Sequence, residues 1–170
     1  RPCIDLHQGQ VKQIVGGTLT ESGASTNFIS SQSAAYYADL YRQHQLTGGH
    51  IIALGPNNQQ QVLAALAAYP KGMQFGGGVN LDNASDYLDA GASHIIVTSY
   101  LFEDGQFSWS RLNAMRSAVG AEHLVLDLSC RKTTKGWMIA TDRWQTITNT
   151  AINKSTIKEL ESHCAEFLVH

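Results

Sequence analysis

The sequence predicts an α/β fold in which helices wrap a parallel sheet, and three observations predict it. Six short apolar runs recur along the chain, and most are continuous rather than alternating, as in strands buried on both faces. The segments between these runs carry helical periodicity and capping residues. Finally, Ile4-Asp5-Leu6 is similar to Leu126-Asp127-Leu128, which suits a duplicated half-barrel that places an Asp at the same point of two strands.

The expected strands alternate with helices, which indicates a parallel sheet. In chain order they are Cys3–Leu6, His50–Leu54, Met73–Phe75, His94–Thr98, Leu124–Leu128 and Glu166–Val169. This pattern fits both a closed barrel and an open doubly wound sheet. A closed barrel usually has ~200–250 residues. Residues 1–170 hold about six strands and five helices, so if the sheet is a barrel they form a single, partial barrel domain.

Four of the five expected helices begin at a side chain that can accept hydrogen bonds from free amides. The expected caps are Ser30 or Ser31, Asn57 or Asn58, Asn80, and Ser108. The expected buried faces are Ala34, Tyr37, Leu40 and Tyr41; Val62, Ala65, Leu66 and Tyr69; Leu81, Ala84 and Leu88; Trp109, Leu112, Met115 and Val119; and Ile157, Leu160 and Cys164. A short hairpin is expected over Gly136–Arg143, and Gly16-Gly17-Thr18 opens a long first loop that suits a lid.

Composition and residue spacing exclude several classes of function. The chain is 43% hydrophobic and 15% charged, and its net charge of −2 lacks the basic surplus that binds nucleic acid. No apolar run approaches the ~18 residues of a membrane span. The three cysteines are widely spaced and the seven histidines lack metal-ligand spacing, so we expect no disulfide framework and no metal site.

A run of glycines predicts a phosphate site. Gly76, Gly77 and Gly78 follow a strand, and Asn80 is expected to open a helix directly after them. Glycines let the backbone approach a ligand closely, and a helix N-terminus presents free amides to an anion. We expect half of a phosphate clamp, completed by Thr98 and Ser99 at the end of the next strand; a plain tight turn is the alternative.

Two aspartates at strand ends predict acid–base chemistry. Asp5 and Asp127 each lie within an apolar strand run, where a carboxyl group is costly to bury unless it is paired or functional. Two such groups facing one cavity suit general acid and general base roles. Arg131 and Lys132 follow Asp127 and either bias a carboxylate, contact an anion or form a solvated pair. Trp144 beside the expected hairpin either covers a substrate or packs.

Taken in order, these motifs resemble a known family. The matching segments are Arg1–Ile14, Gly16–Leu19, Gly48–Pro56, Phe75–Asn80, Ser93–Phe102, Leu124–Lys132, Thr141–Gln145 and Glu166–His170. Together they resemble the eukaryotic-type branch of the phosphoribosylformimino-5-aminoimidazole carboxamide ribotide isomerases of histidine biosynthesis. The resemblance implies a (β/α)₈ barrel and an Amadori rearrangement of the aminoaldose ribotide ProFAR to the aminoketose PRFAR, without a metal or redox cofactor.

The resemblance also implies roles for particular residues. It implies that Asp5 is the base and Asp127 the acid, and that Gly77, Gly78, Thr98 and Ser99 hold one phosphate of a bis-phosphorylated substrate. Bacterial members commonly carry Arg on the first strand where this sequence has Gln13, with Lys12 beside it, so the substrate contact there is left open.

The chain stops at His170, before the second phosphate site that the family uses, so we expect the 170 residues alone to be inactive and to be unstable or associate. The cyclase-type sister barrel of imidazole glycerol phosphate synthase and a non-catalytic phosphate-binding barrel fragment are the alternatives. For the full-length form we expect a monomer without nucleic-acid or membrane partners, in the cytoplasm or alternatively in a plastid.

Overall fold

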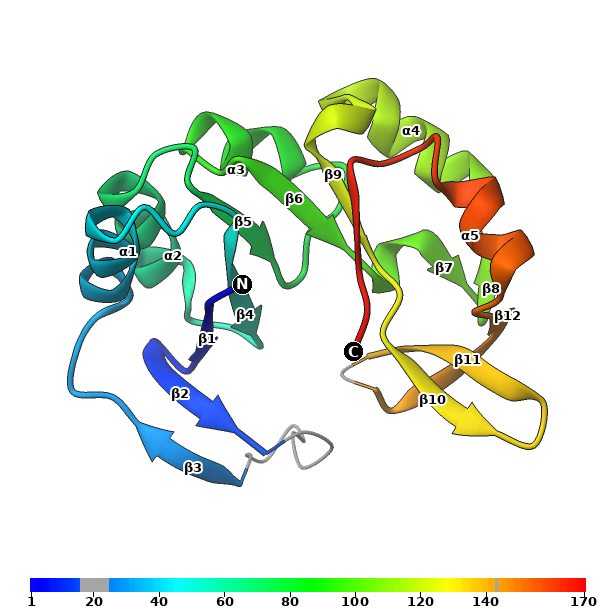
Figure 1. Cartoon of the computed structure of the whole chain (residues 1–170), viewed down its shortest axis with the longest axis horizontal. Coiled ribbons are helices and arrows are strands. Elements are labelled where there is room, and N and C mark those ends of the chain that lie inside the picture. Colours follow the sequence, from blue (N-terminus) through cyan, green and yellow to red (C-terminus); the bar gives the residue numbers. More distant parts are fainter. Residues whose placement is uncertain (16–24, 143) are drawn as a thin grey trace. The chain divides into compact units, whose positions relative to one another are not determined.

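The computed structural model describes residues 1–15, 25–142 and 144–170 (Figure 1). The expected first loop at Gly16–Thr18 therefore lies outside the described residues. The chain divides into two compact units. Unit 1 comprises Arg1–Gly78 and Ser85–Ile95, and unit 2 comprises Val79–Ala84 and Ile96–His170. Each unit is described by itself.

Unit 1 is built on three parallel strands extended by a hairpin. Strand β1 (Cys3–His7) pairs in parallel with β4 (Gly49–Leu54), which pairs in parallel with β5 (Met73–Gly76). On the other side of β1, β2 (Gln10–Ile14) and β3 (Thr26–Ile29) add antiparallel pairs. The register places Asp5 opposite Ile52, and Ile52 opposite Gly76. Asp5 and the start of the glycine turn therefore lie at the same level, two strands apart.

Two helices of unit 1 pack against each other beside these strands (Figure 1). Helix α1 (Ala34–Gln43) begins after Ser33, whose hydroxyl accepts a hydrogen bond from the amide of Tyr36. Helix α2 (Gln59–Ala68) begins after Asn58. The strands and α2 bury a continuous apolar core, which includes Ile4, Leu6, Ile51, Val62, Ala65, Leu66, Met73 and Phe75. Burial of apolar surface contributes about 25 cal/mol per Å², so this core is the main stabilising term of unit 1.

Unit 2 repeats the parallel strand pairing. Strand β9 (Leu124–Asp127) pairs in parallel with β13 (Glu166–Leu168), and helix α4 (Trp109–Val119) precedes β9. A separate antiparallel sheet of three strands, β10 (Cys130–Thr133), β11 (Gly136–Thr141) and β12 (Thr146–Ala151), follows β9. The remaining elements are η1 (Ser99–Leu101), β7 (Phe102–Glu103), β8 (Gln106–Phe107), η2 (Ala121–His123) and α5 (Lys154–Leu160).

Two elements cross or adjoin the boundary between the units. Strand β6 (His94–Val97) has residues in both, and helix α3 (Ala84–Asp89) begins at the last residue of a unit 2 segment. The six expected strands and five α-helices are all present among the described residues, so the α/β prediction is confirmed. The alternation of strand and helix is that of an incomplete (β/α)₈ barrel, and in neither unit do the described strands close into a ring.

The structure corrects several expected boundaries. The first helix is capped by Ser33 rather than Ser30 or Ser31, and the third begins at Ala84 rather than after Asn80. The expected hairpin over Gly136–Arg143 is wrong, because Gly136–Thr141 is the central strand of a three-stranded sheet. Expected inward residues Leu81 and Trp109 are 41% and 42% exposed, and Cys164 lies beyond the end of α5.

Candidate active site

Asp5 lies in β1, and the described residues place one side-chain donor beside it. The strand alternates, so Ile4 and Leu6 are buried on one face while Cys3 and Asp5 lie on the other. The thiol of Cys3 donates to Oδ1 of Asp5 at 3.1 Å. Cys3 as a residue is exposed, but the protein packed around its sulfur and, after it, the Asp5 carboxylate hold the pKa of the thiol above its ordinary value. The thiol therefore stays a protonated donor at neutral pH.

Lys12 and Gln13 occupy opposite faces of β2. The Lys12 side chain is buried, and its ammonium lies 3.4 Å from Nδ1 of His7 and donates to Oε1 of Gln8 at 3.3 Å. Gln13 is exposed. Lys12 thus links the end of β1 to the β1–β2 turn, and of the two side chains only Gln13 is exposed to solvent.

The glycine turn begins where β5 ends. Gly77 has φ +111°, and a Cβ at this position would lie 2.1 Å from the carbonyl oxygen of Ala53 in β4. Gly78 has φ +69° and would place a Cβ in open space. Only glycine permits the close approach of Gly77 to β4. Asp5 and Gly76 are two strands apart, or about 10 Å at the usual spacing of strands, which is within the size of a sugar phosphate.

The helix after the glycine turn does not have the expected geometry. The side chain of Asn80 accepts from the amide of Asp82 at 2.9 Å, and that of Asn83 accepts from the amide of Asn80 at 2.9 Å. These local turns delay the helix to Ala84, and α3 has only six residues. The predicted helix start at Asn80, directly after the glycines, is therefore wrong. Any phosphate at this turn would be held by the amides of the turn itself.

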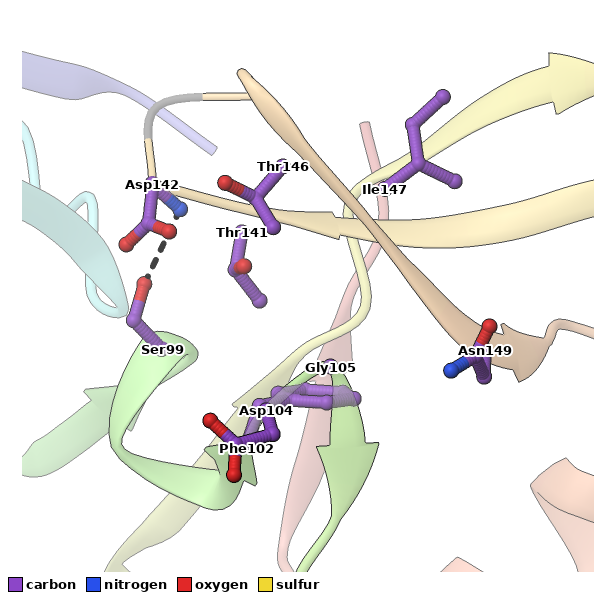
Figure 2. Close-up of a pocket in the computed structure, with 9 residues that line it drawn as sticks. All are labelled: Ser99, Phe102, Asp104, Gly105, Thr141, Asp142, Thr146, Ile147 and Asn149. Carbon is purple, nitrogen blue, oxygen red and sulfur yellow. Dashed lines mark hydrogen bonds between the residues drawn. The ribbon is translucent and has the colours of Figure 1, made fainter.

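Thr98 and Ser99 follow β6 and have different partners within unit 2. The hydroxyl of Thr98 donates to Oδ2 of Asp127 at 2.9 Å. The hydroxyl of Ser99 accepts from the amide of Asp142 at 3.2 Å (Figure 2). Ser99 also lines a pocket of about 430 Å³ that includes the carboxylates of Asp104 and Asp142 (Figure 2). Two carboxylates disfavour a phosphate inside this pocket, so the predicted phosphate contact of Ser99 stays a prediction.

Asp127 is the last residue of β9 and is half-buried. Its Oδ1 accepts two hydrogen bonds from Ser129, one from the amide at 2.8 Å and one from the hydroxyl at 2.5 Å. Its Oδ2 accepts the hydroxyl of Thr98. Sequence reasoning found Asp127 but missed Ser129, although Asp-x-Ser is a spacing at which a carboxylate often accepts from the backbone two residues on.

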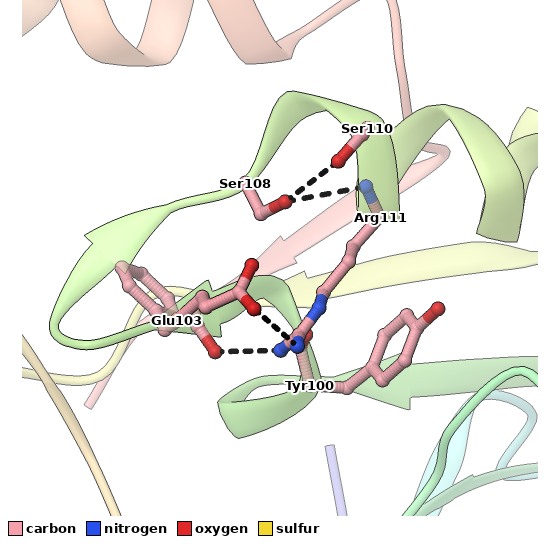
Figure 3. Close-up of polar contacts among 6 residues, drawn as sticks. Tyr100, Glu103, Ser108, Ser110 and Arg111 are labelled. Atoms are coloured by element: carbon pink, nitrogen blue, oxygen red, sulfur yellow. Dashed lines mark hydrogen bonds and ion pairs between the residues drawn. The ribbon is translucent and has the colours of Figure 1, made fainter.

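An arginine that sequence reasoning also missed holds the segment after Thr98 (Figure 3). The guanidinium of Arg111 in α4 donates to the carbonyl oxygens of Tyr100 at 3.2 Å and Phe102 at 2.9 Å, and lies 3.3 Å from the carboxylate of Glu103. It also lies 5.6 Å from the centre of the Tyr100 ring. A single side chain thereby fixes η1 and β7 to the first turn of α4.

The remaining predicted contacts lie in the three-stranded sheet of unit 2. Arg131 is exposed and donates to the carbonyl oxygen of Trp144 at 3.2 Å, and Lys132 is exposed opposite Trp137. The Trp144 ring centre lies 5.4 Å from that of His170. The indole nitrogen of Trp144 is buried without a hydrogen-bond partner in the part of the chain that the structure describes.

Neither a metal centre nor a membrane span is found in the described part of the chain. No group of three or more His, Cys, Asp or Glu side chains there is arranged to hold a metal ion. Within residues 1–15, 25–142 and 144–170, every helix is too short or too polar to cross a bilayer.

Comparisons with known proteins give one consistent result. The profile of the family described as histidine biosynthesis protein matches residues 1–170. Three relatives carry the name 1-(5-phosphoribosyl)-5-((5-phosphoribosylamino)methylideneamino) imidazole-4-carboxamide isomerase, and each is matched by the whole of this chain. They come from Yarrowia lipolytica (47% identity, 67% of its length), Neurospora crassa (49%, 68%) and Medicago truncatula, whose protein is named as chloroplastic (50%, 57%). On the profile match and on these identities, the chain belongs to the histidine biosynthesis protein family.

Proposed function

We propose that this chain carries the active-site aspartates of an aldose–ketose isomerase that converts ProFAR to PRFAR by an Amadori rearrangement. The observation that carries the proposal is the placement of Asp5, at the level of the glycine turn, in a chain that is 47–50% identical to isomerases of one name. The shared name of these relatives favours the isomerase over the cyclase-type sister barrel and over a non-catalytic phosphate-binding fragment.

The chemistry requires one proton donor and one proton acceptor. Asp127 gives a proton to the ring oxygen of the aminoaldose as the C1–O bond breaks, and the electrons of the attached nitrogen form a C=N bond. Asp5 then takes the proton from C2, the C2–H electrons form a C1–C2 double bond, and the electrons of the C=N bond return to nitrogen. Transfer of the C2 hydroxyl proton to C1 completes the aminoketose. The substrate gains one proton from Asp127 and loses one to Asp5, so no oxidant or reductant is consumed, and proton exchange with solvent returns the two carboxyl groups to their starting states.

Binding of the substrate depends on both of its phosphates. We propose that Gly76, Gly77 and Gly78 hold one phosphate through turn amides, with Thr98 and Ser99 as further contacts. A second phosphate site is expected outside the present 170 residues. Gln13, exposed on β2, is a better substrate contact than buried Lys12, while Arg131 and Trp144 are proposed contacts from the three-stranded sheet.

The wider setting of the enzyme is also proposed. A single barrel domain and a monomeric full-length form fit the family resemblance. Cytoplasm is the proposed location, and a plastid is the alternative because one relative is named as chloroplastic.

Turnover of ProFAR by the full-length gene product tests the proposal. We expect Asp5→Asn and Asp127→Asn each to lower kcat by about 10²- to 10⁴-fold, the range that general acid–base groups supply. Asp39→Asn is the matched control, because Asp39 pairs with Arg42 on the surface of α1. Wild-type turnover by either active-site variant, with Asp39→Asn unchanged, would refute the assignment.

The chain itself provides a second comparison. The 170 residues should not turn over ProFAR, whereas the same residues followed by the part of the Neurospora crassa relative that lies beyond the matched segment should. A rate from the 170 residues near that of the extended chain would show that the second phosphate site is dispensable. Their mass in solution should show association, and a cooperative monomer would contradict that expectation.

A further inference from the structure

The carboxylate of Asp127 is held by three donors from two segments of unit 2. Both positions on Oδ1 are taken by the amide and hydroxyl of Ser129, at 2.8 Å and 2.5 Å. One position on Oδ2 is taken by the hydroxyl of Thr98, at 2.9 Å. Among the described residues, no other group donates to this carboxylate. A carboxylate offers about four acceptor positions, so the single open one belongs to Oδ2.

Ser129 is itself fixed in place. It is 3% exposed, and its carbonyl oxygen accepts from the amide of Ala140 in β11 at 2.9 Å. The residues on either side are fixed too, because the amides of Leu128 and Cys130 donate to the carbonyl oxygens of Leu168 at 2.8 Å and His170 at 3.0 Å. Ser129 therefore presents its two donors to Asp127 from a rigid segment between two sheets.

Thr98 is fixed by the short helix that follows it. Its carbonyl oxygen accepts from the amide of Leu101 at 3.0 Å, which closes the first turn of η1. Arg111 holds the next carbonyl oxygens, those of Tyr100 and Phe102, from α4 (Figure 3). The hydroxyl of Thr98 thus reaches Oδ2 from a backbone that two sets of hydrogen bonds hold.

We propose that Thr98 and Ser129 are positioning residues for Asp127, and that Oδ2, the oxygen bonded to Thr98, is the atom that exchanges a proton with the substrate. Ser129 occupies Oδ1 fully and fixes the plane of the carboxyl group. Thr98 occupies one side of Oδ2 and directs the open position away from itself. The proton that Asp127 delivers leaves this position, and the same position accepts a proton when the enzyme is restored.

This inference rests on the proposed function, because it assigns how an acid of that reaction is oriented. For the Thr98 hydroxyl this role is an alternative to the phosphate contact proposed above, because a phosphate contact would act on substrate binding. Loss of a positioning hydroxyl lowers kcat and changes KM little, whereas loss of a phosphate contact raises KM.

The test measures kcat and KM for ProFAR in the full-length gene product. Thr98→Val and Ser129→Ala should each lower kcat about 10- to 100-fold with KM within about threefold, since misplaced catalytic groups lose rates of this order. Thr98→Ser keeps the hydroxyl and should restore kcat to within about threefold of wild type. Thr133→Val is the matched control, because its hydroxyl bonds the Gly136 carbonyl in the β10–β11 turn. It should leave kcat unchanged.

A double-mutant cycle separates the possible failures. In the Asp127→Asn background, Thr98→Val should cost little more, because the group it positions is already lost. If Asp127→Asn is inactive but Thr98→Val retains wild-type kcat, or its effect adds in full to that of Asp127→Asn, the positioning role is refuted and the proposed function stands. If Asp127→Asn is fully active, the proposed function itself fails. Thr98→Ala serves the same cycle if the valine variant does not remain folded.

Discussion

The strand ends of unit 1 and unit 2 each present one aspartate, but their surroundings differ in kind. Asp5 in unit 1 has one thiol donor, and the glycine turn at its level is shaped by the backbone of Gly77 against Ala53. Asp127 in unit 2 has three donors among the described residues, two of them hydroxyl groups, on segments that further hydrogen bonds hold. Steric contact of the backbone determines the conformation of the first region, whereas hydrogen bonds from polar side chains determine that of the second.

This difference predicts which substitutions each region tolerates. In unit 1, an added methyl group at the turn should matter more than a lost polar donor beside Asp5, because an S–H group is a weak donor. In unit 2, a substitution that removes a hydroxyl group but keeps the side-chain volume should matter more. It leaves without a partner the carboxylate oxygen that the hydroxyl now donates to.

The largest effect on stability is expected at the glycine turn. Gly77→Ala would place its Cβ 2.1 Å from the carbonyl oxygen of Ala53 at φ +111°, so the turn must move away from β4. We expect a loss of about 3 kcal/mol or more in the free energy of unfolding, from overpacking and backbone strain together. Urea denaturation of the full-length gene product measures it.

Gly78→Ala is the matched control for that substitution. It has the same residue change and a positive φ of +69°, but its Cβ meets nothing within 4 Å. Only the backbone cost of about 1–2 kcal/mol remains. Equal losses for the two variants would show that conformation, rather than volume, governs the turn.

The strands were predictable from the sequence because burial on both faces leaves a distinctive continuous apolar run. The starts of the helices were less predictable than the strands, for one physical reason. Ser30 and Asn80 have the chemistry of caps, but their side chains accept from the amides of Gln32 and Asp82 in local turns instead. The three-stranded sheet was missed because β12 (Thr146–Ala151) is largely polar and exposed, without the strong apolar pattern of the buried strands.

The candidate site was predictable in its charged and glycine residues but not in their partners. An Asp in an apolar run is conspicuous, whereas the hydroxyl that bonds it comes from Thr98, on another strand end. Thr98 carries no sign in the sequence of whether it faces a phosphate or a carboxylate. Ser129 had the spacing of a local turn, and Arg111 was one of several helix cations with nothing to single it out.

Two arginines, one in each unit, give a second comparison, in which we expect an intermediate loss of stability. Arg111→Ala removes donors to two carbonyl oxygens in unit 2, and we expect about 1–3 kcal/mol of lost stability. Arg42→Ala removes an exposed ion pair with Asp39 in unit 1, where solvent screens the charges and little or no loss of stability is expected. Thermal or urea unfolding of the two variants gives the contrast, and a loss for Arg42→Ala as large as that for Arg111→Ala would contradict it.

The smallest effect is expected at Cys3, and it depends on pH. Cys3→Ala should change kcat by less than about threefold, because the thiol is a weak donor to Asp5. The pKa of the thiol is raised in the folded protein above its ordinary value of 9.0. Below pH 9 the thiol is protonated in both states and has no pH-dependent effect.

As pH rises above 9, the unfolded chain releases this proton first, so wild type should lose stability relative to Cys3→Ala. The difference should stay below about 1 kcal/mol, because Cys3 is exposed and solvent screens the site. Urea midpoints at pH 8 and pH 10 for both proteins measure it. A wild type that gains stability relative to Cys3→Ala as pH rises would contradict this expectation. So would a loss of kcat in Cys3→Ala as large as that of Ser129→Ala. Either result would mean that Cys3 orients Asp5 as Ser129 orients Asp127, and that the two regions do not differ in kind.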